Sequence, residues 1–516
     1  MTLRLSLAAA WLAGVAVAQT SPPPDAKAQL DRIFSQFAHN NTPGCAAGVG
    51  IGDKTVLKAA YGMADLERNV PNTTETVFEA GSVSKQFVAA SLLLLVQRGK
   101  ASLDDPARKY FPELPDYAPS VVALRHLMNH TSGLRDWGGV GAIAGKPRFS
   151  TVAYTNRDVL DIAARQRSLN YRAGDHYSYT NTGYNLLALF VGRVSGKTLA
   201  EFTKAEIFTP LQMTSSGWRD DFRRIVPNRA IAYEPTRDGF RTDMPFETAH
   251  GNGGMLTTIG DLLKWNLNFT HHRVGGKALA EAQIQRAKLN NGSAIAYAAG
   301  LMVSRWRGLQ EVSHSGTTAS YNAWLARYPE QQLSIALLCN VATNPTQLGR
   351  AVAEVFLKPV LGSPDKPTVV KGIEGPGLYR STRDFRVLRL NGQDTGKPLP
   401  TTLEGDPEVF EKVEPSNPSP TTLEQFTGSY TSSEAGTALR AAVEGGKLVL
   451  LQAPDIRIPL SPTWADAFQG SIGSIRFLRN PAGQVTGLSV GSARVWDLRF
   501  RKVLGASRLV APSPSP

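Results

Sequence analysis

A serine and a lysine three positions apart are the residues of this chain whose types and spacing most directly suggest chemistry. Ser82 and Lys85 lie just before an apolar run over residues 87–96. The run predicts a buried helix of about four turns, in which residues i and i+3 share a face. A serine hydroxyl becomes a nucleophile when a base removes its proton, and a lysine can be that base when burial and the positive end of a helix lower its pKa. A chain of this length holds about one such spacing by chance, so the pair gains meaning only from the residues around it.

Two later stretches supply the other groups that acyl transfer through such a pair needs. In Tyr179-Thr180-Asn181 the phenol can pass a proton to a leaving group and the amide can hold a substrate. In His314-Ser315-Gly316-Thr317 the glycine lets a substrate backbone lie against a strand, and the N–H groups of Ser82 and Thr317 are candidates for stabilising an oxyanion. The expected site residues are the catalytic Ser82, Lys85 and Tyr179 and the substrate-binding Asn181, His314, Gly316 and Thr317.

The elements that must position these residues include both strands and helices. Apolar and turn patterns predict a strand hairpin over residues 45–62 and three strands between residues 310 and 340. Helical spacing predicts another set of elements, and a further helix begins near residue 258 after a glycine-rich turn. The helices predicted by spacing are residues 26–37, 121–128, 158–166 and 183–194. The fold class is therefore α/β.

In this order the three stretches resemble the motifs of the penicillin-recognising serine hydrolases, which comprise class C β-lactamases, DD-peptidases and related esterases and D-aminopeptidases. Matching stretches also occur at residues 126–134, 179–187, 253–258 and 328–330, and the resemblance spans about residues 26–360. It implies an antiparallel sheet flanked by helices, and neither a metal nor a cofactor. The roles that it implies are Ser82 as nucleophile, Lys85 and Tyr179 as the acid/base system, and Asn181 and His314 as substrate contacts.

One position departs from the β-lactamase pattern. His314 stands where β-lactamases usually carry a lysine that attracts the substrate carboxylate. A histidine with its reference pKa of about 6.5 is mostly neutral at pH 7. The resemblance links a histidine here to peptidases, esterases and amidases. We therefore expect a serine hydrolase that cleaves ester or amide/peptide bonds through an acyl-serine intermediate. The alternatives are a β-lactamase and a penicillin- or peptidoglycan-binding sensor that is acylated without turnover.

The N-terminus and the cysteines indicate export. A basic residue precedes an apolar run over residues 5–17, and Ala16-Val17-Ala18 is typical of a cleavage site, so we expect a signal peptide at residues 1–18. No later segment reaches the roughly 18 apolar residues of a membrane span, and we expect a soluble periplasmic or secreted protein. The two cysteines, Cys45 and Cys339, allow one bridge or two free buried thiols. The resemblance implies that the first strand pairs with the last strand of the catalytic domain, which would place these cysteines side by side.

The composition narrows the classes of partner. The 516 residues carry a net charge of +13 at pH 7, yet the basic residues stand singly or in pairs, without a block typical of nucleic-acid binding. Hydrophobic residues at 42% and charged residues at 19% are typical of a globular protein. We therefore expect no nucleic-acid partner. The family resemblance implies a small ester or amide or a peptidoglycan-type substrate.

The composition changes after residue 361, which suggests further modules. Residues 377–381 resemble residues 428–432, and residues 410–413 resemble residues 500–503, which indicates a degenerate repeat with a truncated first copy. The expected parts of the chain are a hydrolase domain at residues 19–361, a linker with a partial β segment at 362–420, an all-β, lipocalin-like module at 421–510 and a disordered tail at 511–516.

Several motifs have a simpler interpretation than catalysis. Tyr154-Thr155-Asn156 repeats the Tyr-Thr-Asn pattern, but it directly precedes a predicted helix and is better interpreted as an N-cap. Residues 487–491 match the Gly-x-Ser-x-Gly pattern of α/β-hydrolases, but the chain continues there as a strand and no histidine follows. His126 and His130 are interpreted as structural, and His271-His272 as part of a solvated loop rather than a metal site.

Overall fold

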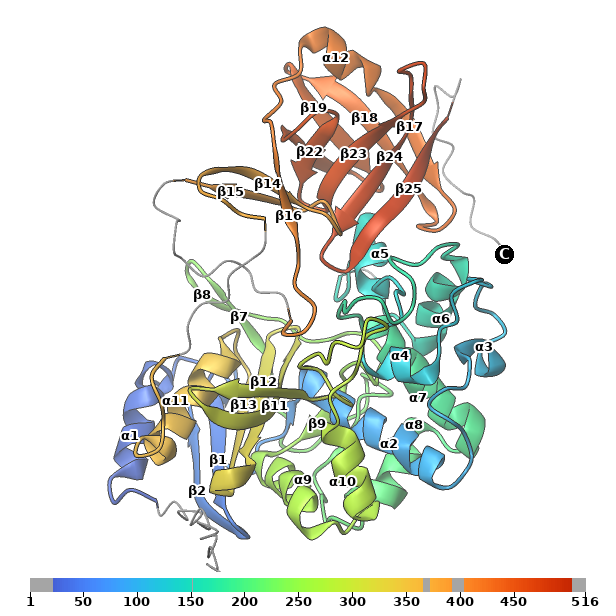
Figure 1. Cartoon of the computed structure of the whole chain (residues 1–516). Coiled ribbons are helices and arrows are strands. Elements are labelled where there is room, and N and C mark those ends of the chain that lie inside the picture. The colour runs from blue at the N-terminus through green and yellow to red at the C-terminus, as the bar shows by residue number, and fades with distance from the viewer. Residues whose placement is uncertain (1–21, 151, 365–371, 392–402, 504–516) are drawn as a thin grey trace, which may run out of the picture.

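The structure, a computed structural model, describes residues 22–150, 152–364, 372–391 and 403–503 (Figure 1). The expected signal peptide, residues 1–18, and the expected tail, residues 511–516, lie outside the described residues. Figure 1 shows a body of sheet and helices that holds the predicted site residues, and a β-barrel that stands on this body.

A six-stranded antiparallel sheet forms the centre of the body. Its strand order is β10-β11-β12-β13-β1-β2. The bounds are β10 Met302–Trp306, β11 Leu309–Thr318, β12 Tyr321–Tyr328, β13 Leu333–Cys339, β1 Cys45–Ile51 and β2 Lys54–Tyr61. Cys45 lies opposite Cys339 in the β1–β13 register, and the two form a disulfide. The strand pairing that the family resemblance implies is therefore confirmed, and of the two possibilities left open for the cysteines the structure contains the bridge.

Helices cover both faces of this sheet. The helices of the body are α1 Ala26–Ile33, α2 Lys85–Gln97, α3 Ala107–Tyr110, α4 Leu124–Met128, α5 Trp137–Ile143, α6 Asn156–Arg165, α7 Asn181–Ser195, α8 Leu199–Thr203, α9 Ile259–His271, α10 Gly276–Ile284 and α11 Pro345–Leu357. Ala47 and Ile335 face the cluster that contains α1 and α11, whereas Ala46 and Leu338 face the cluster of α2, α7 and α9. Successive strand residues point to opposite faces, so both sides of β1 and β13 are buried.

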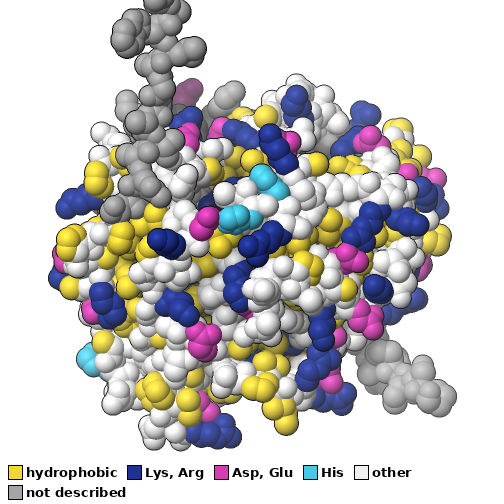
Figure 2. All heavy atoms as spheres, turned by 90° about the horizontal axis from the view of Figure 1, so that it is seen from below, with side chains coloured by type: hydrophobic (Ala, Val, Ile, Leu, Met, Phe, Trp, Pro, Cys, Tyr) yellow, Lys and Arg dark blue, Asp and Glu magenta, His cyan; other side chains and the backbone are white. Residues whose placement is uncertain are grey.

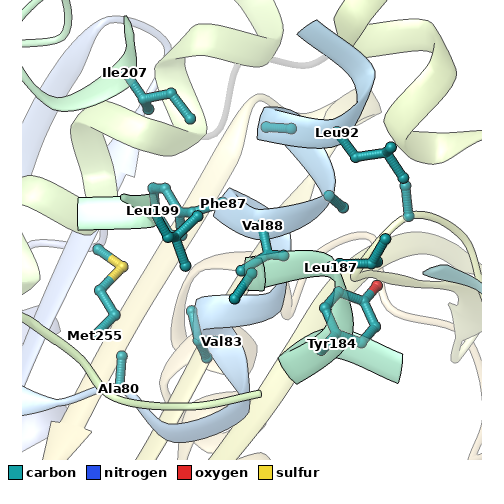
Figure 3. Close-up of a cluster of buried hydrophobic side chains, with 14 of the residues drawn as sticks. Ala80, Val83, Phe87, Val88, Leu92, Tyr184, Leu187, Leu199, Ile207 and Met255 are labelled. Carbon is teal, nitrogen blue, oxygen red and sulfur yellow. The ribbon is translucent and has the colours of Figure 1, made fainter. Parts of the chain in front are cut away.

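Helix α2 is buried along almost its whole length. Every residue from Lys85 to Leu95 is buried. Figure 3 shows Phe87 and Val88 packed among apolar side chains of α7 and α8, and the Phe87 ring also lies 4.5 Å from the Trp265 ring of α9. This packing keeps water away from Lys85 at the N-terminal end of the helix.

Local capping explains where the helices begin. Thr155 accepts a hydrogen bond from the N–H of Asp158 and forms a capping box with it. The stretch Tyr154-Thr155-Asn156 is therefore an N-cap, as predicted. Helix α7 begins at Asn181, earlier than predicted, with Thr180 as its cap. Helix α4 is shorter than the predicted helix over residues 121–128, because the backbone of Val122 and its neighbour pairs with residues 106–107.

A nine-stranded sheet forms the C-terminal barrel, after the short helix α12 (Pro420–Gln425). In sheet order the strands are β20 Ile456–Pro459, β19 Lys447–Gln452, β18 Thr437–Glu444, β17 Gly428–Ser432, β25 Val495–Val503, β24 Val485–Ser492, β23 Gly473–Arg479, β22 Ala467–Gly470 and β21 Ser461–Pro462. The two edge strands, β20 and β21, are separated by Leu460 alone, so the sheet curls until its edges nearly meet. The expected α/β fold with an additional all-β, barrel-like module is confirmed.

A small three-stranded sheet precedes the barrel and has a matching register. It consists of β15 (Val387–Leu390), β14 (Gly377–Ser381) and β16 (Phe410–Val413). Tyr379 pairs with Lys412 in this sheet, and Tyr430 pairs with Lys502 at the equivalent place between β17 and β25. Each tyrosine hydroxyl also donates to a carbonyl four residues earlier. These equivalences support the degenerate repeat that the sequence suggests.

The barrel and the body share one hydrophobic cluster. Trp137, Val140 and Ile143 of α5 lie in the same cluster as Leu450 and Val495 of the barrel. In Figure 1 the turn between β24 and β25 reaches down to α5. The barrel is therefore packed against the helical side of the body that carries the predicted active site.

The surface agrees with the dispersed charge expected from the sequence. On the face seen in Figure 2, Lys and Arg side chains are spread among acidic, polar and hydrophobic ones and form no single block. Within the described parts of the chain, no helix has both the length and the apolar character to cross a membrane.

Candidate active site

Ser82 lies in a 3₁₀ turn that leads directly into α2. The turn spans Gly81–Ser84, and the α-helix begins at Lys85. The sequence predicts an α-helix here, but Gly81 takes a left-handed φ of +50° and the first turn is tighter. A 3₁₀ turn has three residues per turn, so residues i and i+3 lie in line. Lys85 Nζ is 3.0 Å from Ser82 Oγ as a result.

The amine of Lys85 is fully buried and has three oxygen neighbours. Besides Ser82 Oγ, Nζ contacts Asn181 Oδ1 at 3.1 Å and the backbone oxygen of Asn252 at 2.5 Å. Burial, and then the nearby guanidinium groups of Arg494 and Arg148, hold the pKa of Lys85 well below its usual value. A neutral amine has two N–H groups and one lone pair. In this neutral form the two amide oxygens take the N–H groups, and the lone pair is left for the Ser82 hydroxyl.

Tyr179 lies on the other side of the serine. Its hydroxyl is hydrogen-bonded to Ser82, and Lys85 Nζ is 4.8 Å from the centre of its ring. Burial raises the pKa of Tyr179 to about 12, against the opposite effects of the Ser82 hydrogen bond and of Arg494. The phenol is therefore protonated at neutral pH and can act as a proton donor. Lys85, in contrast, is the group of this pair that is ready to accept a proton.

Two glycines bring the backbone of the serine turn against strand β11. A Cβ on Gly81 would lie 2.5 Å from the backbone nitrogen of Thr317, and a Cβ on Gly316 would lie 2.1 Å from the Ala80 oxygen. The missing side chains thus allow the N–H groups of Ser82 and Thr317 to approach each other. Ser82 is the second residue of its turn, so its N–H is outside the intrahelical hydrogen bonds.

Asn181 is held by the loop before α5. Its backbone N–H donates to Asp136 Oδ2 at 2.7 Å, and Asp136 Oδ1 accepts from the N–H of Gly139. Asp136 is therefore occupied as the N-cap of α5. Because Asn181 Oδ1 accepts from Lys85, the NH₂ group of the same amide remains available to a substrate.

His314 belongs to a chain of buried hydrogen bonds with a defined proton order. His130 Nδ1 accepts from the N–H of Thr180, so its Nε2 carries the proton and donates to the hydroxyl of Tyr297 at 3.1 Å. His314 Nδ1 donates to the Ser315 oxygen at 2.6 Å, so its Nε2 accepts from the same hydroxyl at 3.2 Å. His130, interpreted from the sequence as structural, thus supports a residue of the site.

The same surroundings keep His314 uncharged. Burial, with a smaller contribution from Lys85, lowers the pKa of His314 to about 4. At pH 7 the ring is therefore neutral, as its reference pKa already suggested. Position 314 does not supply the positive charge that a lysine would bring.

A cavity of about 390 Å³ opens beside Ser82. Its walls are formed by Ser82, Arg148, Tyr179, Asn181, Asn252, His314, Ser315, Thr317, Thr318 and Arg494. The structure therefore brings the predicted site residues together, with Lys85 and Gly316 directly behind the wall. Five members of the wall were not among the predicted site residues. Ser315 and Thr318 lie within or next to the predicted stretch at residues 314–317, whereas Asn252, Arg148 and Arg494 come from elsewhere in the chain. Asn252 lies in the glycine-rich turn seen in the sequence, but no local signal marks the two arginines.

The motifs set aside in the sequence lie away from this cavity. Ser489 of the Gly-x-Ser-x-Gly stretch is in β24 and donates to Asp497. His271 is at the end of α9, with its Nε2 2.7 Å from Asp53 Oδ1. Neither residue contributes to the wall around Ser82.

Comparison with known proteins identifies the family. The family described as Beta-lactamase matches residues 30–356. Penicillin-binding protein 4* of Bacillus subtilis (strain 168) is 28% identical over 326 residues, which cover 59% of this chain and 69% of that protein. A D-aminopeptidase of Brucella anthropi is 25% identical over 505 residues, which cover 89% of this chain and 95% of that protein.

Solved structures share the fold. The octameric penicillin-binding protein homologue from Pyrococcus abyssi has a TM-score of 0.58 at 19% identity and covers 93% of this chain and 99% of its own. The D-amino acid amidase from Ochrobactrum anthropi SV3, solved with L-phenylalanine amide, has a TM-score of 0.55 at 24% identity and covers 64% of this chain and 97% of its own. The family match contains the Ser82 turn, the start of α7 and strand β11, and this chain belongs to the beta-lactamase family as a serine hydrolase of that fold.

Proposed function

We propose that this protein is an exported hydrolase that cleaves amide/peptide or ester bonds through an acyl-Ser82 intermediate. The observation that carries the proposal is the state of Lys85. Its buried Nζ lies 3.0 Å from Ser82 Oγ, while its other two contacts are oxygens that can only accept. A neutral amine placed in this way is a base directed at one hydroxyl group.

Acylation follows from this arrangement. Ser82 Oγ attacks the carbonyl carbon of the substrate, and the hydroxyl proton passes to Lys85 Nζ. The carbonyl oxygen becomes an oxyanion that accepts hydrogen bonds from the N–H groups of Ser82 and Thr317. As the bond to the leaving group breaks, Tyr179 donates its proton to the leaving atom, and the proton held by Lys85 restores the phenol.

Deacylation uses the same groups in reverse order. A water molecule attacks the acyl carbon and gives one proton to the Lys85–Tyr179 pair, and Ser82 Oγ leaves with a proton from that pair. The product acid and the free serine are regenerated. The presence of both Lys85 and Tyr179 favours a site that turns over, rather than a sensor that stops at the acyl-enzyme.

The substrate class comes from the polar wall and from the relatives. The NH₂ group of Asn181 can donate to a substrate carbonyl, and neutral His314 places no charge beside the scissile bond. The relatives named above include a D-aminopeptidase and a D-amino acid amidase. From the polar wall and these relatives we infer that small amides, esters and peptidoglycan-type peptides are the substrates of this chain.

The nucleophile is tested with a small nitrophenyl ester. Ser82→Ala should abolish release of nitrophenol, and Ser489→Ala, which alters the serine of the Gly-x-Ser-x-Gly stretch, should retain wild-type turnover. Full activity of the Ser82→Ala protein would contradict the assignment of Ser82 as the nucleophile. Loss of activity in the Ser489→Ala protein alone would indicate that the nucleophile is Ser489 of the barrel instead.

Reactions with penicillin and nitrocefin distinguish the proposed hydrolase from a penicillin-binding sensor and from a β-lactamase. A fluorescent penicillin should label Ser82 and then be released, since the base and the proton donor are both present. A label that persists for hours would favour the penicillin-binding sensor. Rapid hydrolysis of nitrocefin, faster than that of D-amino-acid amides, would favour a β-lactamase.

Export to the periplasm or medium is part of the proposal. The pattern at residues 1–18 supports it, and so does the disulfide between Cys45 and Cys339, because such bonds persist in oxidising compartments. The mature N-terminus, read by peptide sequencing of protein from each cell fraction, should be Gln19. Intact Met1 on cytosolic protein would contradict export.

A further inference from the structure

One wall residue of the active-site cavity comes from the C-terminal barrel. Arg494 occupies the turn between β24 and β25, and its guanidinium lies 4.7 Å from the centre of the Tyr179 ring. The side chain is exposed at the mouth of the cavity that Ser82 lines. A residue from a separate sheet therefore faces the incoming substrate.

The turn that carries Arg494 is anchored through its backbone. The Arg494 carbonyl accepts from the N–H of Asp136 and from Asn170 Nδ2, each at 3.2 Å. Asn170 Oδ1 in turn accepts from the N–H of Trp496 at 3.0 Å. The neighbouring carbonyl of Ala493 accepts from Ser178. None of these bonds uses the guanidinium, so the side chain is held at the cavity while its charge remains available.

The charge balance of the cavity wall is positive because of this side chain. Arg148, the other arginine of the wall, forms an ion pair with the buried carboxylate of Glu247. Arg494 has no ion pair with any carboxylate of the described residues. No acidic residue is part of the described cavity wall. The pKa of His314 is lowered to about 4, which keeps its ring neutral at pH 7, and burial lowers the pKa of the Lys85 amine behind it, which favours the uncharged form.

We propose that Arg494 binds a carboxylate of the substrate, so that the preferred substrates are anionic amides, peptides or esters. The inference rests on the proposed function, because it names the substrate class of that same site. A guanidinium matches a carboxylate with two parallel hydrogen bonds, and the interaction is stronger at a partly enclosed surface than in open water. The barrel thus supplies a positive charge that position 314 does not.

The same charge selects against other substrates. A free ammonium group near Arg494 would be repelled, so this chain should prefer substrates with a carboxylate over those with a free amine. The substrate preference that the name of the D-aminopeptidase relative suggests is therefore not expected for this chain. A neutral ester should be hydrolysed without help from Arg494.

The test uses two pairs of esters that differ only in one charge. Mono-4-nitrophenyl adipate carries a carboxylate on the acyl side, and 4-acetoxybenzoate carries one on the leaving group; the methyl ester of each is the neutral partner. The readout is the ratio of kcat/KM for the anionic ester to that for its neutral partner. This ratio cancels any change in the basicity of Lys85, which alters both members of a pair alike.

The variants are Arg494→Gln, Arg494→Lys and, as a matched control, Arg501→Gln on the outside of the barrel. Arg501 is an exposed residue of β25 and is not part of the cavity wall. The wild-type ratio should exceed one for at least one pair, and Arg494→Gln should lower it about 10- to 100-fold. Arg494→Lys should keep part of the preference, and Arg501→Gln should leave it unchanged.

The outcomes separate the two proposals. An unchanged ratio for both pairs in the Arg494→Gln protein overturns the role of Arg494, as does faster turnover of D-alanine 4-nitroanilide than of the anionic esters. Ester hydrolysis that survives Ser82→Ala overturns the proposed function instead. The pair whose ratio falls shows on which side of the scissile bond the carboxylate binds.

Discussion

At the scale of single residues, the protein keeps an amine uncharged inside its core. The amide oxygens of Asn181 and Asn252 accept from Lys85, and neither carries a charge that would stabilise an ammonium group. Full burial adds the cost of removing the charged form from water. Both effects favour the neutral amine, whose lone pair can take the proton of Ser82.

Replacing this base should remove most of the activity. Lys85→Gln keeps a side chain of similar size but cannot accept the serine proton, so kcat/KM for a nitrophenyl ester should fall about 10²- to 10⁴-fold. Lys100→Gln alters an exposed lysine after the end of α2 and should have no effect. Wild-type kinetics in the Lys85→Gln protein would mean that another group takes the proton.

One buried and one partly buried histidine make the stability of the protein sensitive to acid. Burial lowers the pKa of His126 and of His314 to about 4, whereas histidines of an unfolded chain titrate near 6.5. Between about pH 6.5 and pH 4 the unfolded state binds more protons, so the free energy of unfolding decreases as the pH falls through this window. The urea midpoint should be lower at pH 5 than at pH 7.

Two variants test whether His126 contributes to this pH dependence of stability. His126→Gln should show a smaller difference between the midpoints at pH 7 and pH 5, and His39→Gln, at an exposed position, should behave like the wild type. Equal midpoints of the wild-type protein at the two pH values would contradict the argument.

At the scale of elements, the close contact between the serine turn and β11 defines the proposed oxyanion site. Gly316→Ala would place a Cβ 2.1 Å from the Ala80 oxygen, and both sides of that contact are backbone. The strand must move, and the N–H of Thr317 moves with it. Loss of one oxyanion donor costs about 10²- to 10³-fold, so kcat should fall by at least about 100-fold.

The matched control is another glycine-to-alanine change. At Gly260, in α9, the nearest atom to an added Cβ is 3.8 Å away. Gly260→Ala should leave kcat unchanged and increase the free energy of unfolding by about 0.5–1 kcal/mol, because alanine favours the helix. Retention of wild-type kcat by the Gly316→Ala protein would exclude the proposed oxyanion site.

At the scale of the whole molecule, one buried arginine joins the body to the barrel. Arg135 is 1% exposed, and its guanidinium donates to Glu434 at 2.8 Å and to the Asp497 carbonyl at 2.9 Å. It lies next to Asp136, which accepts from the backbone N–H of Asn181. The contact that holds the barrel is thus continuous with the contact that positions the site.

Removal of this arginine should destabilise the protein strongly. Arg135→Met removes the ion-pair partner of Glu434, which then keeps, among the described residues, only the N–H of Arg167, and should reduce the free energy of unfolding by about 3–5 kcal/mol in urea titrations. Arg499→Met breaks a solvent-exposed pair with Asp497 and should cost less than about 1 kcal/mol. Similar small losses in both variants would show that the barrel is not held through Arg135.

Much of the fold and part of the site follow from local signals. The short apolar runs at Cys45–Ile51 and Leu333–Cys339 indicate strands, and Thr155 marks a helix start, because both patterns depend on residues only a few positions apart. The three-residue spacing of Ser82 and Lys85 is also a local pattern. The disulfide required more, since it came from the family resemblance rather than from the residues themselves.

The sequence by itself determined the candidate reacting groups: a serine, a lysine and a tyrosine, in stretches whose local structure orients them. Only the tertiary structure decided their surroundings. Asn252, Tyr297 and Arg494 reach the site through chain packing, and Arg494 does so from a different sheet. The protonation of Lys85 and the charge of the cavity depend on burial and on neighbours distant in sequence. Local patterns carry no information about such contacts, because electrostatic effects act through space and not along the chain.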